Sequence, residues 1–269
     1  MPGCRQHKPG GRRSPRRTPA IPSRGAVVYH HTMRYARDER LALCALLDQA
    51  GPREPTLCEG WATLELAAHL VLREHRPDAG PGLLGGPLAG YTCRVQRKLA
   101  QRTPFPRLVE TIRNGPPRLS VFALPGMDER VNLVEYFVHH EDVRRAQPDW
   151  EPRELGKGLA DALWQRLGMA RFLLRKAPVG VELARDDKPD SEPGSTSELR
   201  GLKASPEASG RHAGSRVRIT ARARTPVVTV TGPPGELTMW ALGRTAAARV
   251  RLDGSEADVK ALSTADWRL

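Results

Sequence analysis

Residues 132–148 read NLVEYFVHHEDVRRAQP, and apolar side chains recur in this stretch at the spacing of a helix. Four valines in or beside it fall on or near one helical face: Val131, Val134, Val138 and Val143. Pro148 cannot continue a helix, because proline lacks the backbone N–H and clashes with the preceding turn. We therefore predict a helix that starts at Asp128 or Asn132 and ends before Pro148.

The same periodicity extends towards the N-terminus. It predicts a helix over 34–49 that ends at Gly51-Pro52, and a second helix with Thr63 as N-cap that runs towards Pro77. Beyond a Gly- and Pro-rich connection, it predicts a third helix over 88–102 and a short one near 106–114. The centre of the chain is therefore expected to be a helical bundle over 33–178.

The pattern changes after a further predicted helix over 155–175. Short β-branched stretches alternate with helical ones in the order VGVELARD, VRITARA, PVVTVTG, PPGELTMWALG, AARVRLDG and SEADVKALS. Residues 186–215 are rich in Ser, Gly, Pro, Glu and Lys and predict a long exposed loop. The predicted fold class is α+β: a helical bundle followed by a small α+β domain over 179–269.

The net charge of +13 is unevenly distributed along the chain. Residues 1–32 hold seven of the 43 basic side chains and none of the 30 acidic ones, and their Pro-, Gly- and Arg-rich composition predicts disorder. Met33 follows directly, so this leader is either disordered or lies upstream of the true start. With the leader set aside the excess of basic residues falls to +6, which argues against nucleic-acid binding.

Other function classes have little support. No apolar run is long enough to cross a membrane, and the leader lacks the apolar region of a secretory signal, so we expect a soluble cytoplasmic protein. The four cysteines form no CxxC pair, which argues against a cysteine zinc site and favours free thiols. Sequence motifs of P-loop proteins, serine hydrolases and HExxH metalloproteases are missing.

Three side chains are candidate metal ligands. Glu135 and His139 are four residues apart and project from one face of the predicted helix, about one turn from each other. His69 lies in the apolar stretch LAAHLVL, where burial of an imidazole requires a hydrogen bond or a metal. Two histidines and one carboxylate match catalytic zinc sites that leave a coordination position open, although iron and other divalent metals fit as well.

A simpler interpretation stays open for each of these residues. A single helical histidine is commonly hydrogen-bonded in the core, and the segment HHED is compatible with a solvated face. His140 points about 100° away from His139, towards a neighbour or solvent. A charged pair near the end of this helix could orient a metal ligand. Solvation is the simpler expectation for its three possible members, Asp142, Arg144 and Arg145. Arg244, at the end of a predicted helix, is suited to hold a carboxylate with two hydrogen bonds, or else offsets the helix dipole.

Three blocks in order resemble the mycothiol-dependent maleylpyruvate isomerase-like family of actinobacteria, within the wider DinB/YfiT-like superfamily. The blocks are EGWATLELAAHL, NLVEYFVHHEDVRRAQP and VTGPPGELTMWALGR, and the resemblance extends over roughly residues 34–265. The loop at 186–215 is longer than the connection usual in that family, and the basic leader is not part of its pattern.

The resemblance implies a DinB-like up-and-down helical bundle that holds a divalent metal, usually zinc, through His69, Glu135 and His139. It also implies a smaller sterol-carrier-like α+β domain whose catalytic arginine corresponds to Arg244. The expected function is a mycothiol-dependent isomerase or S-transferase acting on a small electrophile. The alternative is a non-catalytic metal-binding or stress-response module, and neither substrate nor oligomeric state follows from the sequence.

Overall fold

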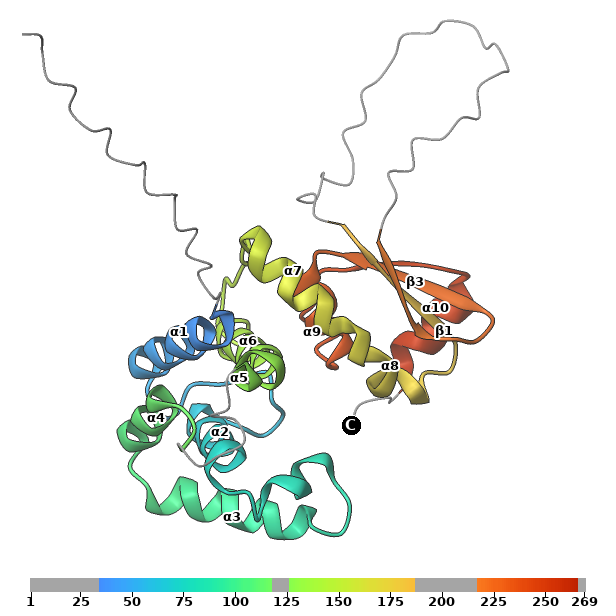
Figure 1. Ribbon diagram of the computed structural model, residues 1–269. Coiled ribbons are helices and arrows are strands. Elements are labelled where there is room, and N and C mark those ends of the chain that lie inside the picture. Colours follow the sequence, from blue (N-terminus) through green and yellow to red (C-terminus); the bar gives the residue numbers. More distant parts are fainter. Residues whose placement is uncertain (1–33, 118–125, 187–216, 266–269) are drawn as a thin grey trace, which may run out of the picture. The chain divides into compact units, whose positions relative to one another are not determined.

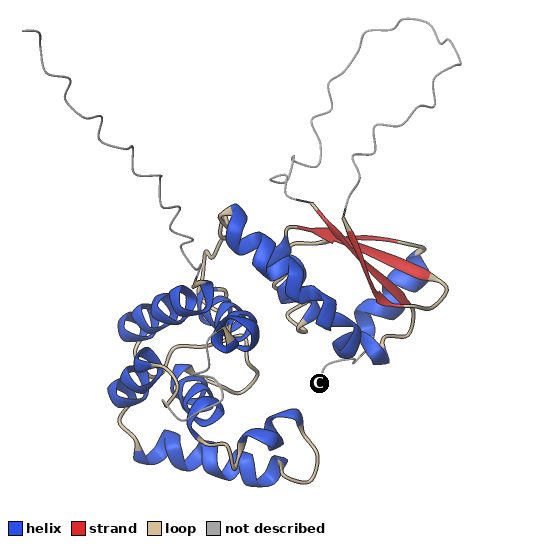
Figure 2. Cartoon of the chain, in the orientation of Figure 1, coloured by secondary structure: helices blue, strands red, loops and turns tan. Residues whose placement is uncertain are grey.

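A computed structural model describes residues 34–117, 126–186 and 217–265, which belong to one compact unit, Arg34–Leu269 (Figure 1). The predictions of a disordered leader over 1–32 and of a long loop over 186–215 fall on residues outside this description, apart from Asp186. The described part of the chain is helical up to residue 176 and contains all of its strands after that point (Figure 2). The predicted α+β class is confirmed at this level.

The helical segment begins close to where the periodicity predicts. Its helices are α1 (Tyr35–Ala50), α2 (Thr63–His75), α3 (Ala89–Arg102), α4 (Phe105–Asn114), α5 (Met127–Val131) and α6 (Leu133–Arg144), with a 3-10 turn η1 (Gly80–Leu84) between α2 and α3. Helix α1 ends at Gly51, which has a positive φ of 77°, a conformation that glycine adopts without a steric penalty. The break between α5 and α6 falls at Asn132, one of the two predicted starts.

Four of these helices share one apolar core. Its buried side chains come from α1, α2, α4 and α6, and they include Leu43, Leu66, Leu70, Ile112 and Tyr136. Because α2 and α6 contribute to the same core, residues on their adjoining edges are brought close together. This packing places His69 of α2 near Glu135 and His139 of α6.

The start of α2 differs from the prediction. Ala62 is the N-cap, and the Glu65 carboxylate accepts a hydrogen bond from the Ala62 backbone N–H at 3.1 Å. Thr63 is the first helical residue, and its hydroxyl donates to the Gly51 carbonyl at 2.5 Å. The prediction of Thr63 as N-cap is therefore wrong, because its hydroxyl joins the helix to the preceding loop.

The predicted helix over 155–175 is shorter and interrupted. Helix α7 spans Lys157–Arg166 and is followed by η3 (Leu167–Met169), the single turn α8 (Ala170–Leu173) and η4 (Leu174–Lys176). Gly168 lies at the interruption, and glycine is a weak helix former. The apolar periodicity continues through the interruption because Leu167, Ala170 and Leu174 remain buried.

The C-terminal segment contains a four-stranded sheet in the order β2-β1-β3-β4. Its strands and helices are β1 (Gly180–Arg185), β2 (Arg218–Arg222), β3 (Val227–Gly232), α9 (Pro234–Ala241), β4 (Arg251–Asp253) and α10 (Glu256–Thr264). Strands β1 and β3 are parallel, and both outer pairings are antiparallel.

One face of the sheet carries the core of this segment. Val181 and Leu183 of β1 are in register with Val228 and Val230 of β3, so the four side chains share a face. They pack with α9, α10 and the turns after α7 through Leu237, Trp240, Leu262, Leu167 and Leu174. Helix α9 is thereby held between the sheet and α7, and the chain that leaves it carries Arg244.

No helix in the described ranges is both long and apolar enough to cross a membrane. This agrees with the sequence, in which charged residues interrupt every apolar stretch.

Candidate metal centre

The three predicted ligands come together between α2 and α6. His69 Nε2 and His139 Nε2 each lie 3.2 Å from the same oxygen of Glu135, Oε1. The two imidazole rings meet edge to face with their centroids 5.2 Å apart. One donor atom from each residue lies within 4.8 Å of the other two, a spacing that allows all three to bind one ion.

The cluster is largely shielded from solvent. The side chains of His69, Glu135 and His139 are 12%, 27% and 9% exposed. They line a cavity of about 630 Å³ together with Trp61, whose ring centroid is 5.1 Å from that of His69, and with Arg244. The cluster therefore combines three donor atoms with a space that a small molecule can enter.

Burial and hydrogen bonding affect the three groups differently. Burial lowers the pKa of His69, which favours the neutral imidazole that binds metals. For Glu135, burial opposes ionisation, but hydrogen bonds with both histidines outweigh it and hold the pKa of the carboxyl well below its usual range. For His139, burial opposes the charged form, but hydrogen bonds with Asp142, Cys58 and Glu135 raise the pKa well above its usual value.

A second group of residues supports His139 from its other side. Asp142 Oδ2 lies 2.9 Å from His139 Nδ1, and the Cys58 thiol donates to the same oxygen at 3.2 Å. Arg244 binds both oxygens of Asp142, with Nε to Oδ1 at 2.9 Å and Nη2 to Oδ2 at 2.7 Å. Arg244 thus holds a carboxylate with two hydrogen bonds, as the sequence suggested, but this carboxylate belongs to the protein.

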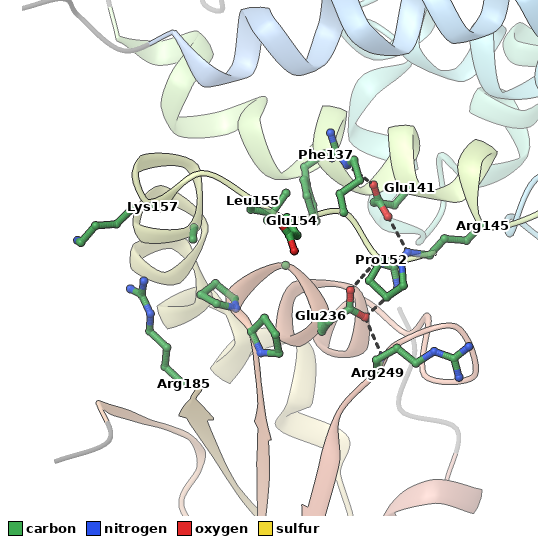
Figure 3. A pocket seen from close by; sticks show the side chains of 15 residues that line it. Phe137, Glu141, Arg145, Pro152, Glu154, Leu155, Lys157, Arg185, Glu236 and Arg249 are labelled. Atoms are coloured by element: carbon green, nitrogen blue, oxygen red, sulfur yellow. Dashed lines mark hydrogen bonds and ion pairs between the residues drawn. The ribbon is translucent and has the colours of Figure 1, made fainter. Parts of the chain in front are cut away.

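Apart from Arg144, whose side chain is 26% exposed, the charged residues after His139 are buried, which corrects the expectation that they are solvated. His140 is buried and its Nδ1 lies 2.9 Å from Glu39 of α1. Arg145 is buried between Glu141 and Glu236, with Nε 2.6 Å from Glu141 Oε2 and Nη2 2.6 Å from Glu236 Oε1 (Figure 3). Arg144 also binds Glu141, at 3.0 Å.

Sequence reasoning found the three candidate ligands but missed the supporting role of Cys58, and it favoured solvation for Asp142. One local signal points to Asp142: it follows His139 by three residues, so the two share a helical face. No comparable signal connects Cys58 to this site, because 81 residues separate it from His139.

A larger cavity of about 720 Å³ lies elsewhere and contains none of the three candidate ligands. Phe137, Leu155 and the two prolines at the start of α9 line it, together with charged side chains that are mostly paired (Figure 3). Size alone therefore does not select the candidate site, and the donor chemistry favours the smaller cavity.

Comparison of the chain with protein-family models, with curated proteins and with solved structures finds no match.

Proposed function

We propose that this protein binds a divalent metal ion through His69, Glu135 and His139 and uses it, with a low-molecular-weight thiol, in an isomerisation or S-transfer reaction. Zinc is the preferred ion and mycothiol the preferred thiol, as the sequence resemblance suggests. In the same proposal the helical segment is a DinB-like bundle, the C-terminal segment is a sterol-carrier-like domain, and the protein acts in the cytoplasm.

The observation that carries the proposal is the convergence of two imidazole nitrogens on one carboxylate oxygen. Both Nε2 atoms lie 3.2 Å from Glu135 Oε1, at the wall of a cavity. An ordinary buried histidine needs one hydrogen-bond partner, and a single carboxylate would serve it. Two histidines from different helices around one carboxylate oxygen are better explained by an ion that both imidazoles and the carboxylate bind.

The donor set fits such an ion. Two imidazoles and one carboxylate are the ligands of catalytic zinc sites that retain an open position. When His69 Nε2 binds a metal, Nδ1 carries the ring proton, and this buried N–H has no acceptor among the described residues, in contrast to His139. A bound divalent ion supplies Lewis acidity, which lowers the pKa of a thiol at the open position.

The chain's own residues would position the reactants. Trp61 and Leu57 line the cavity and give it apolar walls that exclude water from a thiolate. Arg73 Nε lies 3.4 Å from Glu135 Oε1 and helps to keep this carboxylate ionised. Arg244 lies at the same cavity, and it or another basic group would bind an anionic substrate.

One observation favours the alternative of a non-catalytic metal-binding module. Arg244 directs Nε and Nη2 to Asp142, and its Nη1 donates to the Leu242 carbonyl at 2.8 Å. A substrate carboxylate would have to compete with these partners. Under this alternative the cluster stores or senses a cation, and water takes the remaining position.

The test is elemental analysis of the purified protein, starting at Met33, beside two matched variants. His69→Ala removes a proposed ligand, whereas His75→Ala removes an imidazole on the same helix outside the cluster. We expect about one equivalent of metal in the wild-type protein and in His75→Ala, and far less in His69→Ala. Equal metal content in all three proteins would refute the metal site.

A second measurement separates enzyme from binding module. Metal-loaded protein is assayed for thiol-dependent turnover of maleylpyruvate and of a model electrophile. Turnover that needs both thiol and metal supports the enzyme, whereas full metal content without turnover supports the binding module.

A further inference from the structure

We propose that Asp142, held in place by Arg244, is a positioning residue for His139: it keeps the ring proton on Nδ1 so that Nε2 presents its lone pair beside Glu135. The inference rests on the proposed metal site and adds what orients one of its ligands.

The two ring nitrogens of His139 face different partners. Nδ1 lies 2.9 Å from Asp142 Oδ2, and Nε2 lies 3.2 Å from Glu135 Oε1. An ionised carboxylate only accepts hydrogen bonds, so a ring nitrogen at this distance from Asp142 carries the proton. Nε2 also lies beside a carboxylate, Glu135, and can carry a proton when no metal is bound. A bound metal ion would take the place of this proton at Nε2, while Asp142 retains the proton on Nδ1.

Asp142 is itself fixed by two partners besides His139. Its side chain is fully buried, Arg244 binds both of its oxygens, and the Cys58 thiol donates to Oδ2. Arg244 is in turn fixed at the end of α9, where its backbone N–H donates to the Met239 carbonyl at 3.0 Å. The orientation of a ring on α6 thereby depends on a residue 102 positions after Asp142.

A second group of possible metal ligands, which includes the other nitrogen of the His139 ring, is less suited to bind a metal. Donor atoms of Cys58, His139 and Asp142 also lie within 4.8 Å of one another. However, the Arg244 guanidinium contacts two of these residues, with Nη2 3.6 Å from Cys58 Sγ and 2.7 Å from Asp142 Oδ2. A cation there would face a permanent positive charge, so Nδ1 serves orientation and Nε2 serves binding.

The competing explanation is that the Asp142–Arg244 pair only joins the helical segment to the sheet segment. The chain offers a matched pair for comparison. Arg145, one turn after Asp142, makes two hydrogen bonds to Glu236 of α9, at 2.8 and 2.6 Å, and both side chains are buried. This second pair makes the same connection but contacts none of the candidate ligands.

The experiment measures zinc affinity of the full chain by competition with a chelator, together with thermal unfolding in excess chelator. Asp142→Asn retains the size of the side chain, but its amide can donate to Nδ1 and favour the tautomer with the proton on Nε2. We expect Asp142→Asn to weaken zinc binding about 10- to 100-fold and Arg244→Lys to weaken it less. Glu236→Gln should lower the melting temperature but leave zinc affinity within about threefold of wild type.

The tautomer is also observed directly. In zinc-loaded wild-type protein, side-chain nitrogen NMR should show His139 with a protonated Nδ1, and Asp142→Asn should lose this signal. If Asp142→Asn does not fold, the comparison of Arg244→Lys with Glu236→Gln decides between the two explanations.

Unchanged zinc affinity in Asp142→Asn, or an equal loss in Glu236→Gln, overturns the positioning role and leaves the metal site intact. If wild-type protein binds zinc no better than His69→Ala, the proposed function fails and the positioning role fails with it.

Discussion

At the scale of single residues, the second half of α6 is unusual because it is buried on every side. Tyr136, Phe137 and Val138 are followed by four buried ionisable residues in a row, from His139 to Asp142. Burial of such groups is unfavourable unless each has a partner, and each one here has a partner outside its own turn or on another element. The partners come from α1, from the segment before α7 and from the end of α9.

Gly235 allows α9 to approach this helix closely. A Cβ at Gly235 would lie 2.8 Å from Leu155 Cδ1 and 3.1 Å from Phe137 Cζ. We expect Gly235→Ala to lower the free energy of unfolding by about 1–3 kcal/mol, measured by denaturant titration, because the core must shift. Gly90→Ala is the control: apart from its two chain neighbours and the backbone of its own helix, no described atom lies within 4 Å of a Cβ there, and alanine in α3 should stabilise by about 0.5 kcal/mol. If Gly235→Ala leaves the free energy of unfolding unchanged, the packing of Gly235 against Leu155 and Phe137 has room for an added methyl group.

The thiols should differ strongly in reactivity. Burial raises the pKa of Cys44 to about 12, and its Sγ donates weakly to the Val109 carbonyl at 3.7 Å. Cys93 is exposed on α3. We expect Cys93 to react rapidly with a maleimide at pH 7.5 and Cys44 to react only after unfolding. Peptide mass spectrometry after brief labelling distinguishes them, and labelling of Cys44 in the native protein at the rate of Cys93 would contradict the prediction.

The candidate ligands could be predicted from sequence because their signals are local. The spacing of Glu135 and His139 shows that they share a helical face, and the apolar neighbours of His69 imply a buried imidazole. The role of Asp142 could not be predicted in full, since it depends on Arg244, and periodicity carries no information on contacts between distant segments. Solvation of HHED was a reasonable but wrong expectation, because its partners lie elsewhere in the chain.

At the scale of elements, boundaries were predictable where a strong breaker follows a periodic stretch. Gly51 and Gly115 end α1 and α4, and each has a positive φ. The interrupted region after α7 was not predictable, because its apolar periodicity continues through the 3-10 turns. The pairing of β1 with β3 was also beyond sequence reasoning, since β2 lies between them along the chain.

Helix α10 offers a clear test of capping. Ser255 is its N-cap, and the hydroxyl accepts a hydrogen bond from the Asp258 backbone N–H at 3.2 Å. We expect Ser255→Ala to cost about 1 kcal/mol of stability in thermal or denaturant unfolding. Ser263→Ala, in the same helix, should be neutral or slightly stabilising, because Ser263 only donates back to the Val259 carbonyl. Equal effects of the two substitutions would argue against a capping role.

At the scale of the whole described molecule, ion pairs add polar contacts between α1, α6 and α9, helices that also share an apolar cluster containing Ala36, Phe137 and Met239. Arg153 contacts both Glu39 of α1 and Glu141 of α6, and Arg145 continues the network from Glu141 to Glu236 of α9. Glu39 and Glu141 each bind more than one basic side chain, so protonation of either carboxylate weakens several contacts. The stability of this network should therefore depend on pH.

Glu39 provides the pH test. Burial opposes its ionisation, but hydrogen bonds with His140 and Arg153 outweigh burial and lower its pKa below the usual 4.5. A carboxyl with a lowered pKa stabilises the folded state above its unfolded pKa, and this contribution disappears as pH falls through the folded pKa. In chelator, the melting temperature of the wild-type protein should therefore fall below about pH 4.5. Glu39→Gln should be about 3–5 kcal/mol less stable at pH 7 and should lose less stability in acid. Glu110→Gln is the control, because the pKa of Glu110 is also lowered but its carboxylate is exposed and screened by solvent. The melting temperature of Glu110→Gln should vary with pH as that of wild type does, whereas the melting temperatures of Glu39→Gln and wild type should converge in acid. If the curves of Glu39→Gln and wild type stay parallel, Glu39 does not have this role.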